Sequence, residues 1–474
     1  FSSVFCITLA EILLLYIVAE NIKPFGAYAE QTFNNGISTL GPADRVQLES
    51  TESVPVYRQV DDLIYFSSKM KFAYETAKVK VTFKNANPTQ KIYIGYKDQD
   101  TWHYTNMLID DENFNASGWS QVGQFPTLYQ KTPKYASAAD FFSNPPSDAI
   151  IGLHNFDKES LPYPAITIPN YQPSKIPTII TTPIRGSFTF YAYLNKEPFV
   201  LDIQKQDLNW YGGADEMSVQ VYKDKDLVYQ QGVVDDGVED ASKKALPPQL
   251  VHIENPGADL PEPGVYKIVV ETTTDTVVKS IKTNLHKIVF EGPLFVVENS
   301  SNYPTIAKNT KPTELFTNSL LVKAKTYHSN TLQALYFGEN AFYLDQTGVE
   351  QTYTPYAGNF YKLTIPKSDV ILNGIGYFAF SSDQFFTPSP YHTFNISNAD
   401  DFKWTDYILT NYQAPTVQGD YKVAEQDFDI SKAVAKNGLL SWIIKAPGLK
   451  TSGGNIIIKD IQVDLYKKPL IKLK

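Results

Sequence analysis

Apolar and polar residues alternate with a period of two in many short stretches of this chain. Residues 77–83 (AKVKVTF) follow this pattern, and residues 91–96 (KIYIGY) resume it after a turn at Asn87-Pro88. Successive side chains of a strand point to opposite faces, so the two stretches predict a hairpin with one solvated face. Similar stretches, separated by Gly, Pro and Asp, continue to residue 465. The pattern therefore predicts a mainly β protein.

The composition agrees with this prediction. The 474 residues include 31 Tyr, 28 Phe and 30 Pro but only 3 Met, a mixture that favours strands and turns over helices. The best short helix after the N-terminus is expected within residues 135–148, where Pro145-Pro146 ends it. A chain of this length exceeds what one hydrophobic core usually serves, so several domains are expected.

The expected fold is a tandem of antiparallel β-sandwich domains, jelly-roll and immunoglobulin-like, after an N-terminal hydrophobic helix. Stretches that contain Pro and Gly suggest where the domain boundaries lie. The expected parts are a signal peptide or membrane anchor at 1–29, a linker at 30–48, a first sandwich at 49–170, a proline-rich linker at 171–184, an immunoglobulin-like sandwich at 185–298, and a jelly-roll-like domain at 299–474 with a possible split near 393.

Two blocks resemble known families of exported bacterial β-sandwich proteins. Residues 428–431 (FDIS), 440–444 and 456–465 look like the last strands of galactose-binding-like jelly rolls. The block from Arg185, with its FTFY strand at 188–191 and the turn at 235–237, is similar to immunoglobulin-like or prepeptidase-type sandwiches. The resemblance implies an architecture, and it implies no ligand or site residue.

The N-terminal apolar run predicts export. Residues 4–19 are apolar apart from Glu11 and small polar side chains, which is short for a membrane span, and Ala27-Tyr28-Ala29 has the form of a signal-peptidase site. A cleaved signal peptide is the first interpretation and a retained membrane anchor the second. The expected location is therefore secreted or cell surface, with membrane contact only through this segment.

Charge and motif content exclude several functions. The net charge of −9 includes no basic stripe of the kind that phosphate contacts require, so nucleic acid is not an expected partner. The single Cys6 lies in the N-terminal apolar run, which leaves the rest of the chain without a thiol. The six His residues show no metal-ligand spacing. No catalytic motif is recognised, and no catalytic residue is predicted.

Aromatic residues are the candidates for ligand binding. Trp and Tyr can stack on a sugar ring while neighbouring polar groups bind its hydroxyls, although packing in a core is the commoner fate of these side chains. The predicted glycan-contact residues are Trp102, Tyr104, Trp210 and Tyr211.

A second candidate is a structural calcium ion. Calcium takes hard oxygen ligands, and the acidic turn at 235–240 offers Asp235, Asp236, Glu239 and Asp240 without the spacing of an EF-hand. A solvated turn without metal is the alternative. No other cofactor is expected.

These observations favour a non-enzymatic extracellular or cell-surface protein with a structural or adhesive role at the envelope. The first alternative is a carbohydrate-binding module array, and the second is an accessory or degenerate exported hydrolase. Glycans and other envelope proteins are the expected partners, and self-assembly through sheet edges is a further possibility.

Overall fold

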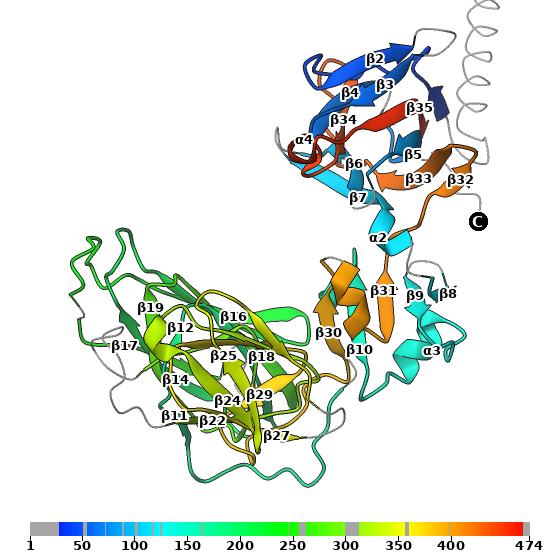
Figure 1. Ribbon diagram of the computed structural model, residues 1–474. Helices are drawn as coiled ribbons and strands as arrows, with labels where there is room; N and C mark the ends of the chain where they lie inside the picture. Colours follow the sequence, from blue (N-terminus) through cyan, green and yellow to red (C-terminus); the bar gives the residue numbers. More distant parts are fainter. Residues whose placement is uncertain are drawn as a thin grey trace, which may run out of the picture.

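The computed structural model describes residues 28–467, except for 51–54, 72, 88–89, 100–102, 116–117, 124–125, 163–164, 245, 256–261, 299–311, 356–359 and 398. The predicted leader, with its hydrophobic helix, lies almost wholly outside the described residues. Within the described residues, no helix has the length and apolar character needed to cross a membrane. The protein is mainly β, as predicted, and its sheets form three units (Figure 1).

The first unit, which we call the outer sandwich, combines strands from both ends of the chain. Its seven-stranded sheet has the order β2-β3-β35-β5-β33-β32, with β1 also paired to β35, and it faces a four-stranded sheet of order β4-β34-β6-β7. The strands are β1 (Tyr28–Gln31), β2 (Val46–Ser50), β3 (Val56–Gln59), β4 (Leu63–Lys69), β5 (Thr76–Asn85), β6 (Lys91–Lys97), β7 (Tyr104–Asp111), β32 (Thr416–Gln418), β33 (Tyr421–Asp429), β34 (Leu439–Lys445) and β35 (Ile456–Tyr466), with short helices α2 (Glu112–Asn115) and α4 (Leu449–Ser452).

Long-range pairing holds the outer sandwich together. β5 is antiparallel to β35, with Val81 opposite Ile461, and to β33 on its other side. The predicted hairpin of 77–83 with 91–96 is wrong, because β5 already has a partner on each side and β6 crosses to the facing sheet. Trp442 of β34 fills the core between the sheets, and its indole nitrogen donates to Ser68 Oγ at 2.8 Å.

The second unit is a small mixed sheet, which we call the middle sheet. Its order is β30-β10-β31-β9-β8, and β10 runs parallel to both of its neighbours. The predicted short helix is present here, with Ser137 as its N-cap accepting from the Asp140 backbone N–H. The elements are β8 (Ser120–Val122), β9 (Thr127–Gln130), α3 (Ala138–Ser143), β10 (Ile150–His154), η1 (Lys158–Ser160), β30 (His392–Asn395), η3 (Ala399–Trp404) and β31 (Tyr407–Thr410).

The third unit, the large sandwich, packs a nine-stranded sheet against a ten-stranded sheet. The nine-stranded sheet contains β11 (Thr178–Ile180), β12 (Ile184–Arg185), β14 (Val200–Asp207), β17 (Gln249–Glu254), β19 (Thr276–Thr283), β21 (Leu294–Val296), β23 (Val322–Lys325), β26 (Gln351–Tyr353) and β28 (Val370–Gly374). The ten-stranded sheet contains β13 (Phe188–Leu194), β15 (Met217–Lys223), β16 (Asp226–Val233), β18 (Gly264–Thr272), β20 (Lys287–Glu291), β22 (Thr313–Thr317), β24 (Gln333–Phe337), β25 (Asn340–Leu344), β27 (Tyr361–Ile365) and β29 (Tyr377–Ala379), and η2 (Ser329–Thr331) lies in a connection.

The sheets do not follow the linear division expected from the sequence. One hydrophobic core extends from Ile180 to Phe378 and so crosses the expected boundary at 298/299. The proline-rich segment 171–184 carries β11 and β12, which pair with β19, and the segment 30–48 carries parts of β1 and β2. The chain runs from the outer sandwich through the middle sheet into the large sandwich and returns the same way (Figure 1). Each junction is therefore crossed by two chain segments.

Candidate functional site

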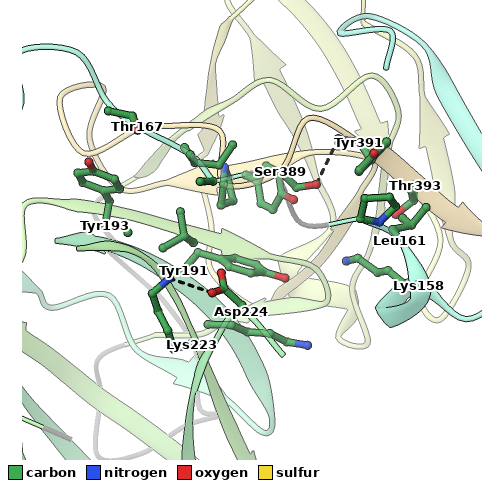
Figure 2. Close-up of a pocket in the computed structure, with 18 of the residues that line it drawn as sticks. Lys158, Leu161, Thr167, Tyr191, Tyr193, Lys223, Asp224, Ser389, Tyr391 and Thr393 are labelled. Carbon is green, nitrogen blue, oxygen red and sulfur yellow. Dashed lines mark hydrogen bonds and ion pairs between the residues drawn. The ribbon is translucent and has the colours of Figure 1, made fainter. Parts of the chain in front are cut away.

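A pocket of about 220 Å³ lies where the large sandwich meets the two segments that join it to the middle sheet (Figure 2). The outer face of the ten-stranded sheet contributes one side of this junction pocket. Residues 161–162 and 165–167 of the outgoing segment and residues 388–393 of the returning segment contribute the other side. A ligand bound here would therefore contact two units at once.

Strand pairing places the tyrosines of the junction pocket. Tyr191 and Tyr193 are two apart on β13, so both point to the outer face, whereas Phe190 points into the sandwich core. On the neighbouring strand β18, Lys267 lies opposite Tyr191 and Val265 lies opposite Tyr193. These four side chains form a block of aromatic, apolar and ammonium groups on the pocket's sandwich side.

Each lysine of the junction pocket is paired with a carboxylate. The pairs are Lys158 with Glu291, Lys267 with Glu159 at 2.8 Å, and Lys223 with Asp224 at 3.1 Å. Three positive and three negative groups cancel formally, so the pocket has no net charge from these residues. Paired ammonium and carboxylate groups still offer hydrogen bonds, because an ammonium has three donors and a carboxylate has about four acceptor positions.

The tyrosine hydroxyls differ in their hydrogen bonding. The Tyr191 hydroxyl donates to Glu291 Oε2 at 2.8 Å, and the Tyr391 hydroxyl donates to the Phe142 carbonyl at 3.4 Å. The Tyr193 hydroxyl forms no hydrogen bond with any described residue, although its ring packs against Tyr171 at a centroid distance of 5.0 Å. This hydroxyl is therefore available to a ligand in the junction pocket, which Tyr193 lines together with Thr167 (Figure 2).

Gly264 at the start of β18 lets Lys223 reach the pocket. Its φ is +136°, and a Cβ at this position would lie 2.9 Å from Lys223 Nζ. A larger residue would be strained and would displace the ammonium. Lys158 and Thr393 also line a second hollow, which extends along the middle sheet. The two hollows together can accept an elongated ligand.

A buried polar network at the other junction resembles a hydrolase triad. His154 Nε2 lies 2.9 Å from Asp111 Oδ2, and its Nδ1 lies 3.1 Å from Thr410 Oγ1. However, His154 and Asp111 are each only 2% exposed and Thr410 is fully buried, so a substrate does not reach them. Burial lowers the pKa of His154. We interpret the network as a structural connection between the outer sandwich and the middle sheet.

The aromatic residues predicted to bind glycans lie in different units. Trp102 is outside the described residues. Tyr104 begins β7 of the outer sandwich and lies tilted against Tyr65. Trp210 is half-buried in the large sandwich under the Arg185 guanidinium, which is 5.0 Å from the ring, and Tyr211 is 62% exposed. Tyr104 therefore lies in a different unit from the neighbouring residues Trp210 and Tyr211, and glycan contact at the predicted residues stays a prediction.

The predicted calcium ligands separate into two pairs. Asp235 and Asp236 are half-buried and lie with Asp207 so that one carboxylate oxygen from each is within 4.8 Å of the others. Glu239 and Asp240 are exposed. Asp207 was missed in the sequence because it ends β14, which is 28 residues before the acidic turn; only the fold brings it there.

Sequence reasoning also missed the junction pocket. The signal was present in the FTFYAYL strand, where large aromatic residues occupy both faces: Phe188 and Phe190 inside, Tyr191 and Tyr193 outside. Aromatic residues on both faces indicate that the outer face is also covered. The segments that cover it include residues 161–162, 165–167 and 388–393, and no local pattern reveals this.

Comparisons with known proteins leave the family open. No family model and no curated protein matches the sequence. Among solved structures, dimeric latent PorU from Porphyromonas gingivalis is 10% identical with a TM-score of 0.16; the match covers 64% of this chain but 33% of PorU, so the chain spans about a third of it. The infectious bursal disease virus VP2 subviral particle is 8% identical with a TM-score of 0.15, covering 94% of this chain and 82% of VP2. Similarity at this level carries no argument about function.

Proposed function

We propose that this protein is a non-enzymatic binding protein of the structural or adhesive kind, and that the junction pocket takes a neutral, hydroxyl-rich ligand such as a glycan. The observation that carries the proposal is the combination of a tyrosine-lined wall with lysines that are all charge-paired. Secretion or display at the cell surface, predicted from the N-terminal segment, is part of the same proposal.

The chemistry of the pocket suits a sugar. The hydroxyls of a sugar both donate and accept hydrogen bonds, so they can use the Lys223 ammonium, the Asp224 carboxylate and the Tyr193 hydroxyl together. The C–H faces of a sugar pack well against aromatic and aliphatic groups such as Tyr191 and Val265. A charged ligand would have to compete with the existing ion pairs, whereas a neutral ligand leaves them intact.

The same features support ligand binding without catalysis. Each carboxylate around the junction pocket is bound to a lysine, so none is left as a free proton acceptor. The pocket also lies at a junction that the chain crosses twice, so a bound ligand would contact both connecting segments at once. This arrangement suits a protein whose role is to hold a surface ligand.

A glycan array probed with the intact chain tests the proposal. The blocking variant is Thr167→Trp, because Thr167 is exposed at the pocket and an indole there fills the space with little cost to folding. The matched control is Thr352→Trp on β26, an exposed position that does not line the pocket. The proposal expects neutral glycans to bind the wild type and the control but not Thr167→Trp. Equal binding by all three proteins, or binding of no glycan, would overturn it.

A further inference from the structure

The large sandwich contains a group of carboxylates at one end, which we call the acidic end. It consists of Asp207, Asp215, Asp235, Asp236 and Asp275, from β14 and from the loops after β14, β16 and β18. Direct hydrogen bonds join them: the Asp215 N–H donates to Asp235 Oδ1 at 2.8 Å and the Asp236 N–H donates to Asp207 Oδ2 at 3.1 Å. The buried Lys205 ammonium donates to Asp207 Oδ2 at 2.7 Å. Lys205 thus forms an ion pair with one of the five carboxylates.

Three oxygens at the acidic end are buried without a donor. They are Asn209 Oδ1, Asp215 Oδ2 and Asp275 Oδ1, and none has a hydrogen-bond partner among the described residues. Asn209 is completely buried, and Asp215 and Asp275 are 4% and 3% exposed. A buried acceptor without a donor costs about 1–3 kcal/mol, and more when it is charged. Three such oxygens within one group of contacting residues therefore indicate a missing partner.

Other contacts join the residues that carry these three oxygens. The Thr273 hydroxyl donates to Asp215 Oδ1 and accepts from the Asp275 N–H, so these two aspartates share one threonine. Asn209 directly precedes Trp210, whose N–H donates to Asp275 Oδ2 at 2.8 Å. The Asn209 amide nitrogen donates to Asp236 Oδ2 at 3.1 Å. The acceptors that lack donors are therefore part of the acidic end.

A divalent cation would supply the partner that these oxygens lack and would balance the negative charge of the five carboxylates, whereas water would supply only the partner.

We propose that the acidic end of the large sandwich binds a calcium ion through Asn209 Oδ1, Asp215 Oδ2 and Asp275 Oδ1. Calcium takes carboxylate and amide oxygens in flexible geometry, which is the donor set present here. One oxygen from each of Asp207, Asp235 and Asp236 lies within 4.8 Å of the others, but each of these carboxylates already accepts from N–H or ammonium groups. They supply negative potential while the three free oxygens bind the ion. This inference is independent of ligand binding in the junction pocket.

Thermal unfolding of the full chain, with calcium or with EDTA, tests the proposal. If calcium is present at 100 times its dissociation constant, the wild-type midpoint rises by about 5–10 °C. Asp215→Asn removes one charge and keeps the shape. Its midpoint in EDTA is above that of wild type, because repulsion is relieved, and its affinity for calcium is about tenfold lower.

A terbium titration provides a second measurement. Terbium(III) replaces calcium at oxygen sites, and Trp210 is placed to sensitise its emission because the Trp210 backbone contacts Asp275. Calcium is expected to displace the emission in wild type, and Trp210→Phe is expected to lose the emission while keeping the calcium-dependent midpoint. The matched control is the double variant Glu239→Gln, Asp240→Asn in the exposed part of the turn, which is expected to behave as wild type.

Two results would overturn the proposal. One is a wild-type midpoint that calcium does not raise, which would mean that water fills the site. The other is an equal calcium response in wild type, Asp215→Asn and Asp275→Asn, which would place the ion elsewhere.

Discussion

The pairing of the two ends of the chain makes a sharp prediction about Ile461. This side chain is fully buried on β35, opposite Val81 of β5, although 380 residues separate the two positions along the chain. Ile461→Ala removes three buried carbons and leaves a cavity, at a cost of about 2–5 kcal/mol. The cost is carried by the whole outer sandwich, because β35 lies between β3 and β5 in its larger sheet.

Hydrogen–deuterium exchange measures this effect segment by segment. At about 1.4 kcal/mol per factor of ten, amides of β5 and β6 that exchange by opening of this unit are expected to exchange roughly 30-fold faster or more. Amides of β13 and β18 in the large sandwich are expected to keep their rates. The matched control is Ile365→Ala on β27, which is expected to show the reverse pattern. Faster exchange confined to residues after 421 would refute the pairing.

Three further predictions concern charge. The pKa of His154 is lowered by burial, so as the pH falls below about 6.5 the unfolded chain takes up a proton before the folded chain does. The free energy of unfolding therefore falls with pH by up to about 1.4 kcal/mol per pH unit. Urea titrations at several pH values should show a smaller dependence of this free energy on pH for His154→Gln than for wild type. An equal slope would contradict this. Lys205→Met leaves the buried Asp207 carboxylate without its ammonium and should lower the free energy of unfolding by about 3–5 kcal/mol in EDTA; a change well below 1 kcal/mol would contradict it. Because the pocket lysines are paired, calorimetry should find glycan affinity within about twofold at low and high salt, and a steep fall with salt would indicate a charged ligand.

Much of the fold could be predicted from local pattern. Alternation identified the strand of residues 77–83 as β5 and that of residues 455–465 as β35, because burial on one face leaves a period of two in the sequence. Trp442 lies within the mainly apolar stretch 440–444, and its side chain is fully buried. The turn residues around Pro145 correctly ended the short helix.

Strand partners could not be predicted in this way. A period of two fixes which face of a strand is buried, but it says nothing about the neighbouring strand. The sequence analysis assigns Val81 and Ile461 to two separate domains, and only the fold shows that they are opposite each other. The same limit applies to the proximity of Asp207 and Asp235 and to the shared pocket of Tyr193 and Thr167. Both candidate sites are made by residues from distant segments. The sequence shows the types of these residues, but only the fold shows that they lie close together.

The most direct test of the proposed function is the affinity of Tyr193→Phe for a glycan that binds the wild type. The Tyr193 hydroxyl is available to a ligand, and its loss leaves the ring packing on Tyr171 in place. Isothermal titration should show an affinity lower by roughly 2- to 10-fold, the value of one hydrogen bond, while Tyr343→Phe on the exposed edge strand β25 should bind as wild type. Equal affinities for wild type and Tyr193→Phe would contradict binding in the junction pocket.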